Sequence, residues 1–172
     1  YGGVKKYQWT SIPLSLHGVV IKKDGERVEI VIGEEPKEPV FVISDILPHL
    51  GQKQMEKPMK DAITGEDLNA IAGSIPLSEE EKDKTKINVL KILNEKYGLV
   101  EEDFTSAELE LVPAGFSRDV GLDESMILGY GQDDRICVFS ALKAILDLKD
   151  TPERTSIFFF VDKEEIGSEG NT

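Results

Sequence analysis

Cysteine, tryptophan and histidine are scarce in this chain of 172 residues, which contains one Cys, one Trp and two His. The single cysteine, Cys137, excludes an internal disulfide and is typical of proteins in a reducing compartment, so we expect a cytoplasmic location. No histidine lies near it in the sequence to activate a thiol, so we expect Cys137 to be a core residue rather than a nucleophile.

Basic residues are also few. The chain has 20 Lys and Arg but 33 Asp and Glu, so its formal net charge is −13. This balance argues against nucleic acids and anionic membrane surfaces as partners, since both are bound through basic patches. No apolar run approaches the roughly 20 residues that span a bilayer. A nucleotide-binding role has no support either, since the chain has neither a Gly-x-Gly-x-x-Gly nor a Walker sequence.

One run of apolar β-forming residues stands near the end of the chain, Ile157-Phe-Phe-Phe-Val161, and the acidic pair Glu164-Glu165 follows it. The pattern predicts a buried strand that ends in a turn, where sites of α/β sheets usually lie. Two adjacent carboxylates at such a point can divide two tasks, because one can bind a metal while the other activates a water. The alternative is a solvated surface pair.

A second acidic pair, Asp133-Asp134, precedes a segment with apolar residues at 138, 141, 142, 145 and 146. This spacing predicts a buried helix whose first turn contains the pair. Aspartates at this position often only cap a helix, which is the structural alternative. A helix followed by a short turn and a strand forms half of a βαβ unit, so both acidic pairs can meet at one edge of a sheet.

Several motifs occur in a characteristic order, chiefly Gly129-Tyr-Gly-Gln-Asp-Asp-Arg135 and Asp162-Lys-Glu-Glu-Ile-Gly-Ser168. With segments 1–9, 13–20, 106–110 and 117–123, they make the chain resemble the aspartyl aminopeptidase/vacuolar aminopeptidase I family of dinuclear zinc aminopeptidases, in its bacterial form. The resemblance implies an α/β fold (α+β overall). Residues 104–172 would form the edge of an α/β catalytic domain, and residues 1–103 an inserted β-rich dimerisation domain.

The resemblance also implies roles for single residues. Asp134 is similar to the aspartate that bridges two metal ions, and its peptide bond to Arg135 would be cis. Glu164 resembles the general base, and Glu165 a terminal ligand of one metal. Two Zn²⁺ ions per active site are implied, with cobalt or manganese as alternatives, because carboxylate-rich sites discriminate poorly between metals.

The remaining ligands of the family, a His in a His-x-Asp motif and a final Asp and His, have no counterpart in this chain. Only two of five expected ligands are present, so we expect an incomplete chain that is inactive by itself. His49, in a Pro-His-Leu segment, resembles the family's histidine that reaches into the partner subunit and stabilises the substrate carbonyl; otherwise it is an exposed turn residue. His17 alternates with apolar residues as in a strand, which favours a structural role.

The pattern along the chain predicts the other elements. Asp24-Gly25 is expected at the turn of a hairpin, Ser78 and Glu81 as a capping box, and Gly98 as the end of the helix that follows. The expected ranges are strands at 16–21, 27–33, 40–44 and 104–112, an irregular segment at 51–77, a helix from 78 to 97, and a loop at 116–128.

Three functions fit these patterns. The first is a metal-dependent aminopeptidase that removes acidic or neutral N-terminal residues from peptides, and the resemblance implies homo-oligomers built from dimers, such as a dodecamer. The second is a non-catalytic oligomerisation domain in which the acidic pairs are structural. The third is a glycosidase-like hydrolase with two carboxylates about 5–9 Å apart, although Trp9, the single Trp, offers little aromatic surface for a sugar.

Overall fold

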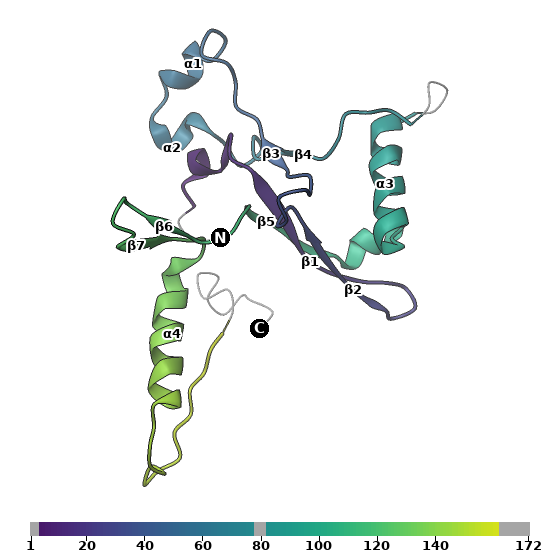
Figure 1. Cartoon of the computed structure of the whole chain (residues 1–172). Helices are drawn as coiled ribbons and strands as arrows, with labels where there is room; N and C mark the ends of the chain where they lie inside the picture. Colours follow the sequence, from purple (N-terminus) through teal and green to yellow (C-terminus); the bar gives the residue numbers. More distant parts are fainter. Residues whose placement is uncertain (1–3, 78–81, 162–172) are drawn as a thin grey trace. The chain divides into compact units, whose positions relative to one another are not determined.

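The structure, a computed structural model, describes residues 4–77 and 82–161 of the chain. The chain divides into two compact units, Lys5–Phe116 and Ser117–Thr172 together with Tyr1–Val4 (Figure 1). Helices and antiparallel sheets occur in the described part, which confirms the mixed α/β class. The division into a dimerisation domain, 1–103, and a catalytic part, 104–172, stays a prediction.

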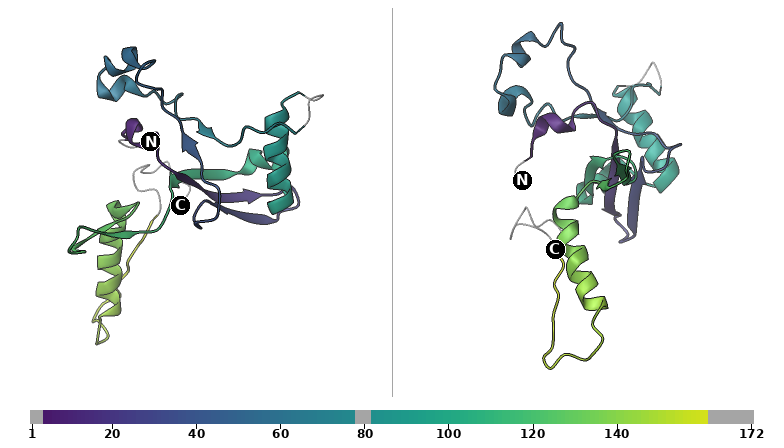
Figure 2. Two further views of the ribbon diagram at one scale, coloured as in Figure 1. Left: turned by 45° about the horizontal axis from the view of Figure 1, so that its top comes forward. Right: turned by 60° about the vertical axis from the view of Figure 1, so that its left-hand side comes forward.

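The larger unit is built on a three-stranded antiparallel sheet with the order β2-β1-β5 (Figure 2). Strands β1 (Leu14–Ile21) and β2 (Arg27–Ile32) form the predicted hairpin, and Asp24 Oδ1 accepts a 3.0 Å hydrogen bond from Glu26 N in its turn. β5 (Glu108–Pro113) pairs with the other side of β1. This pairing holds the chain up to Phe116 in the same compact unit as β1.

The core of this unit lies on one face of the sheet. Val20, Ile30, Ile32 and Leu99 are buried together there. Burying each such side chain contributes about 1.5–3 kcal/mol relative to exposure. Partly buried hydrophobic residues complete the cluster: Leu16, Val28, Phe41, Leu93, Tyr97, Phe104, Ala107 and Leu109.

Helix α3 (Lys84–Tyr97) stands beside this sheet (Figure 1). Leu93 and Tyr97 pack against the core, and Tyr97 Oη donates a 3.0 Å hydrogen bond to Val31 O. The helix ends at Gly98 as predicted, because a φ of +68° suits glycine best. The predicted capping box, Ser78 and Glu81, lies outside the described residues.

Short elements fill the region before α3. β3 (Val42–Ile43) and β4 (Ala70–Ile71) form a two-residue antiparallel pair, so the strand predicted at 40–44 is shorter than expected. The segment predicted as irregular contains two single-turn helices, α1 (Gln52–Met55) and α2 (Met59–Ala62), as Figure 1 shows. The 3-10 helix η1 (Lys6–Trp9) precedes β1.

The strand predicted at 104–112 is partly wrong, because the 3-10 helix η2 (Glu101–Ser106) occupies its beginning. Asp103 accepts a 2.9 Å hydrogen bond from Val100 N and so closes the first turn of this helix. Ser106 Oγ donates to Ile21 O and joins η2 to the end of β1. The alternation of apolar residues therefore becomes a strand only from Glu108 onward.

The smaller unit begins with a hairpin of β6 (Arg118–Val120) and β7 (Met126–Leu128), so the prediction of a loop at 116–128 is wrong. Each strand has only three residues, too few for an alternating pattern to identify. Helix α4 (Gln132–Leu146) follows and confirms the predicted helix. Among the described residues, neither α4 nor any other helix is long and apolar enough to cross a membrane.

Two predictions about burial in this unit are wrong. None of the apolar residues predicted to be buried in α4 is buried: 138, 141 and 145 are half-buried, Leu142 is 41% exposed and Leu146 is 71% exposed. Residues 157–161 form no strand, and Phe159 is 85% exposed. A strand needs a neighbour for its N–H and C=O groups, and no strand of the described part pairs with this segment.

Candidate functional site

The predicted metal site starts at the turn between β7 and α4. Gly131 is the N-cap of α4 with a φ of +72°, a conformation that glycine adopts without strain. Gln132 Nε2 donates a 3.2 Å hydrogen bond to Ile127 O in β7. The first residue of the helix is thereby tied to the hairpin that precedes it.

Arg135 holds the other side of this turn. Its Nη1 donates a 3.1 Å hydrogen bond to Tyr130 O, and its Cζ lies 6.0 Å from the centroid of the Tyr130 ring. The guanidinium also covers Gly131, because a Cβ added there would lie 3.2 Å from Arg135 Cζ. The Arg135 side chain therefore packs over Tyr130 and Gly131, which lie just before the acidic pair in the sequence.

The acidic pair lies where the backbone departs from helical geometry. Asp133 has φ −91° and ψ 107°, and Asp134 has φ −120° and ψ 23°. The cis peptide bond joins Asp133 to Asp134, so the prediction of a cis bond between Asp134 and Arg135 is wrong by one position. Both aspartates are exposed at the start of α4, which leaves their carboxylates accessible.

Cys137 lies one turn further along α4 and is exposed, so the prediction of a core position is wrong. Hydrogen bonding to the Asp134 carboxylate, followed by the negative charge of that group, raises the pKa of the Cys137 thiol above its ordinary value. Asp134 therefore acts on the ionisation of a residue one turn further along the same helix.

The oxygen donors of this turn suit zinc, which carboxylates bind at about 2.0–2.2 Å. Within residues 4–77 and 82–161, however, no group of three or more His, Cys, Asp and Glu side chains is placed to hold a metal ion. The predicted base, Glu164, and the predicted ligand, Glu165, lie outside the described residues. Of the predicted metal ligands, the described residues therefore contain Asp134, and its role as a ligand stays a prediction.

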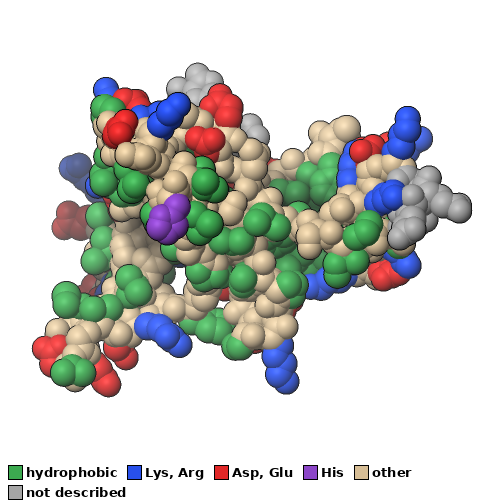
Figure 3. Space-filling model, turned by 90° about the horizontal axis from the view of Figure 1, so that it is seen from above, with side chains coloured by type: hydrophobic (Ala, Val, Ile, Leu, Met, Phe, Trp, Pro, Cys, Tyr) green, Lys and Arg blue, Asp and Glu red, His purple; other side chains and the backbone are tan. Residues whose placement is uncertain are grey.

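His49 lies in the larger unit, in a tight turn between β3 and α1. The amides of Leu50 and Gly51 donate to Leu47 O at 2.9 Å and 2.8 Å. His49 is exposed, and so are Leu47 at 66% and Leu50 at 73%. Figure 3 shows hydrophobic side chains next to a histidine on one face of the molecule. Its predicted action on a partner's substrate stays a prediction.

His17 occupies a structural position, as expected from its place in the sequence. It lies in β1, where Gly18 follows it, and its Nε2 is 2.6 Å from Glu34 Oε1. Ser15 Oγ donates a 2.8 Å hydrogen bond to the same oxygen. His17 is thus part of a polar cluster on the sheet rather than of the predicted metal site.

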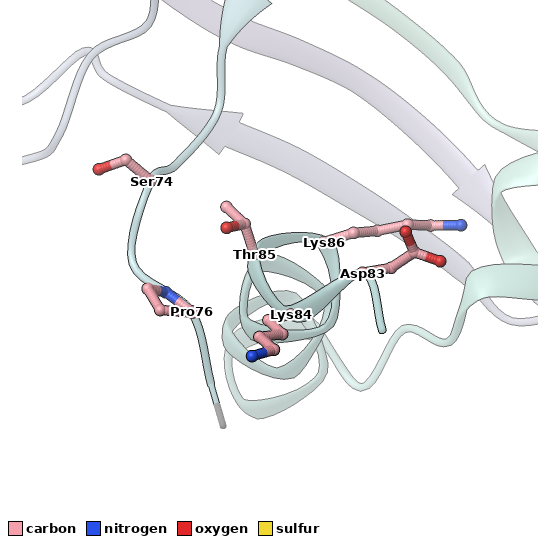
Figure 4. Close-up of a pocket in the computed structure, with 6 residues that line it drawn as sticks. All are labelled: Ser74, Pro76, Asp83, Lys84, Thr85 and Lys86. Carbon is pink, nitrogen blue, oxygen red and sulfur yellow. The ribbon is translucent and has the colours of Figure 1, made fainter. Parts of the chain in front are cut away.

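An open surface hollow lies at the start of α3 (Figure 4). Its lining consists of Ser74 and Pro76 from the approach to α3 and of residues 83–86. Two lysines and one aspartate among them give it mixed charge. None of the residues predicted to bind metal or to act in catalysis lines it, so it is not the site that the sequence predicts.

Residues that shape the two candidate positions were not singled out from the sequence. Gln132 and Arg135 contact the turn before α4. Asp45 Oδ1 accepts a hydrogen bond from Gln54 Nε2 at 3.0 Å across the segment that carries His49. Arg135 was visible as part of a motif, but an Asp and a Gln nine positions apart form no recognisable pattern.

Known proteins resemble this chain over its whole length. A family model described as aminopeptidase I zinc metalloprotease (M18) matches residues 1–172. The probable M18 family aminopeptidase 1 of Clostridium acetobutylicum is 57% identical over 173 residues, which are 100% of this chain and 37% of that protein.

Two solved structures agree in fold with this chain. The crystal structure of an M18 family aminopeptidase from Thermotoga maritima is 56% identical with a TM-score of 0.88, and the match covers 99% of this chain and 37% of that one. Aminopeptidase I of Borrelia burgdorferi is 50% identical with a TM-score of 0.79, over 96% of this chain and 36% of that one. These matches confirm the resemblance predicted from the sequence: the chain belongs to the aminopeptidase I zinc metalloprotease (M18) family.

Proposed function

We propose that the protein containing this chain is a metal-dependent aminopeptidase, which removes acidic or neutral N-terminal residues from peptides. The observation that carries the proposal is the match of the family model to all 172 residues. The chain spans 37% of the Clostridium relative. The activity therefore belongs to a protein of the relatives' length that contains this chain, which is called the full-length protein below.

The proposed metal site holds two zinc ions, with Asp134 as the bridging ligand and Glu165 as a terminal ligand. Cobalt or manganese are alternatives, since oxygen donors bind all three metals. When bound, such ions polarise the carbonyl of the scissile peptide bond and make a water more acidic. The exposed position of Asp134 in the first turn of α4 supports this role. Because Asp133 is adjacent and equally exposed, it is tested beside Asp134.

Glu164 is the proposed general base. It takes a proton from the attacking water and then delivers that proton to the amine that leaves. Its position next to Glu165 gives one carboxylate for the proton and one for the metal. Such a division of roles requires both side chains to face one cleft.

His49 is the proposed donor to the substrate carbonyl in a partner subunit. A donor aimed at the charge that develops on this oxygen contributes about 3–4 kcal/mol to catalysis. The exposure of His49 on a turn supports a role at a surface. The proposal therefore includes a homo-oligomer built from dimers, such as a dodecamer, with sites completed across the subunit contact.

The activity is tested with the full-length protein by measuring metal-dependent release of N-terminal residues from short peptides that begin with Asp or with Leu. Glu164→Gln should abolish turnover while the zinc content stays at two per subunit. Glu165→Gln should lower the zinc content. Unchanged turnover in Glu164→Gln would refute the base assignment, and absence of any aminopeptidase activity in the loaded protein would refute the function.

The bridging ligand is identified by comparing Asp134→Asn with Asp133→Asn, which differ only in position. Loss of both zinc ions should accompany Asp134→Asn, since one carboxylate binds both. If only Asp133→Asn loses zinc, the bridging role belongs to Asp133.

A second candidate, a non-catalytic oligomerisation domain, is favoured by the apolar residues around α1 and α2. Leu50, Met55 and Met59 are each at least 65% exposed. The two functions are compatible and are separated by mixing His49→Ala subunits with Glu164→Gln subunits. Glu164→Gln alone should be inactive, and His49→Ala alone should keep only a residual kcat, about 10²–10³-fold below the original. Recovery of activity in the mixture requires an active site to which both subunits contribute. A domain with only a structural role would give no recovery.

A further inference from the structure

We infer that Asp45 and Gln54 form a clamp that positions His49, and that both are positioning residues for its action on the substrate carbonyl. This inference rests on the role proposed for His49. Asp45 Oδ1 accepts a 2.8 Å hydrogen bond from Ile46 N and a 3.0 Å hydrogen bond from Gln54 Nε2. The Asp45 oxygen thus joins the start of segment 45–54 to helix α1, which lies at the end of that segment.

The turn inside the clamp is closed by the backbone. Leu47 O accepts hydrogen bonds from the amides of Leu50 and Gly51, and Gly51 O accepts one from Met55 N at 3.0 Å. These bonds fix the shape of the turn and its continuation into α1. The clamp adds a link from the helix back to Asp45, which the local bonds of the turn do not provide.

Gln54 also packs over the turn. Gly51 is buried, and a Cβ added there would lie 3.3 Å from Gln54 Oε1 and 3.0 Å from Ile46 Cγ2. The side-chain amide of Gln54 therefore has both ends in use, with Nε2 on Asp45 and Oε1 against Gly51. This proximity is a second observation, beside the hydrogen bond, that places the Gln54 amide over the turn.

The surroundings of the clamp argue for a positioning role rather than for a role in core stability. Asp45, Ile46 and His49 are exposed, and the core cluster of the unit is formed by other residues. A histidine that acts across a subunit contact must be held in place by its own segment. Misplacement of a catalytic group by about 1 Å can lower a rate by about a hundredfold.

The test uses Gln54→Glu in the full-length protein, since this change keeps the shape of the side chain and places a carboxylate against Asp45. We expect kcat to fall by about tenfold, while KM and the thermal unfolding temperature stay close to their original values. The matched control is Gln52→Glu, an exposed glutamine in the same helix. Its kcat should not change.

The double variant Asp45→Asn with Gln54→Glu restores the bond with donor and acceptor exchanged. The new amide at position 45 can accept from Ile46 N through its oxygen and donate through its nitrogen to the new carboxylate at position 54. Recovery of kcat in the double variant supports the clamp. An unchanged kcat in Gln54→Glu, or a kcat that stays low in the double variant, overturns it.

A further pair of measurements separates the clamp from the role of His49. In a His49→Ala background, Gln54→Glu should cause no additional loss, because both act through one side chain. If His49→Ala itself leaves kcat unchanged, the role proposed for His49 fails. If His49→Ala lowers kcat and Gln54→Glu lowers it further by the same factor as in the original protein, the clamp acts elsewhere and the inference is refuted.

Discussion

His17 and Glu34 face each other with Nε2 and Oε1 2.6 Å apart, so that β1 is joined to the segment that follows β2. Ser15, fully buried in β1, donates to the same oxygen at 2.8 Å. The hydrogen bond from Ser15 and then that with His17 lower the pKa of Glu34 below its ordinary value. The folded protein therefore favours the ionised carboxylate.

The first prediction concerns acid stability and Glu34. A carboxylate with a lowered pKa in the folded state stabilises the fold at pH values above its unfolded pKa of about 4.3, and this stabilisation is lost as the pH falls through the folded pKa. Glu34→Gln should therefore lower the thermal unfolding temperature of the full-length protein at pH 6. The difference from the original protein should shrink as the pH falls from 5 toward 3.

The control for this prediction is Glu35→Gln, a neighbouring exposed glutamate whose side chain has no part in the Ser15 and His17 cluster. Glu35→Gln should not change how the thermal unfolding temperature depends on pH. A Glu34→Gln profile that runs parallel to that of the original protein from pH 6 to pH 3 would show that Glu34 contributes no ionisation-linked stability.

The second prediction concerns Gly18, at the centre of β1 between β2 and β5. Its φ is +150°, and an added Cβ would lie 1.9 Å from Glu108 O, a backbone atom that cannot move without breaking the strand pair. Gly18→Ala should therefore destabilise the protein by at least about 2 kcal/mol. Differential scanning calorimetry of the full-length protein measures this as a lower unfolding temperature.

Gly65→Ala is the matched control for Gly18→Ala, because an added Cβ there meets nothing within 4 Å. Its effect should stay within about 0.5 kcal/mol. Equal effects of the two substitutions would show that β1 and β5 are not as close in solution as this structure places them.

The third prediction concerns the thiol of Cys137. Its pKa is raised by the hydrogen bond with Asp134 and by the negative charge of that carboxylate, so less thiolate is present at a given pH than for an ordinary cysteine. Cys137 is exposed, and alkylation by iodoacetamide should therefore be limited by ionisation rather than by access. Asp134→Asn should speed alkylation at pH 8 and shift its pH profile to lower values.

Asp147→Asn serves as the control for this charge effect, because this aspartate lies near the other end of α4 and pairs with Lys143. Its alkylation profile should match that of the original protein. A profile that does not respond to Asp134→Asn would contradict the contact between the carboxylate and the thiol.

Local signals in the sequence were sufficient where a few neighbouring residues determine the backbone. The Asp24-Gly25 turn predicts the β1–β2 hairpin, and Gly98 predicts the end of α3. The period of apolar residues identifies α4 but not its exposure, because burial depends on what packs against a helix and not on its own pattern. The strand predicted at 157–161 is absent for the same reason, since β-forming residues still require a paired neighbour.

The candidate site could be predicted only in outline. Similarity in motifs identifies the acidic pair in the first turn of α4, whereas the effect of Asp134 on the pKa of Cys137 depends on side-chain placement that no motif encodes. The clamp on the His49 turn joins residues nine positions apart through one oxygen, and such pairs become visible only when the turn between them is placed. Glu164 and Glu165 stay predictions, because they lie outside the described residues.

The last prediction concerns Arg135, which packs over the turn that leads into the acidic pair. Its bond to Tyr130 O and its place against Gly131 hold the backbone before Asp133 and Asp134. Partners that orient metal ligands typically contribute about 10–100-fold to metal affinity. Arg135→Ala should therefore weaken zinc binding by the full-length protein by about tenfold, measured by competition with a chelating dye.

Arg135→Lys tests which property of the side chain matters. Lysine keeps the positive charge but lacks the planar group that bonds to Tyr130 O while covering the ring and Gly131. If the packing orients the turn, Arg135→Lys should lose nearly as much zinc affinity as Arg135→Ala, whereas an effect of charge alone would leave it near the original value. Arg154→Ala, at an exposed arginine beyond α4, should not alter zinc affinity. Zinc affinity is measured without substrate, so it reports on the metal site alone. A loss of affinity in both Arg135 variants would assign the effect to the geometry of the turn. An unchanged affinity in both would show that the acidic pair keeps its place without Arg135.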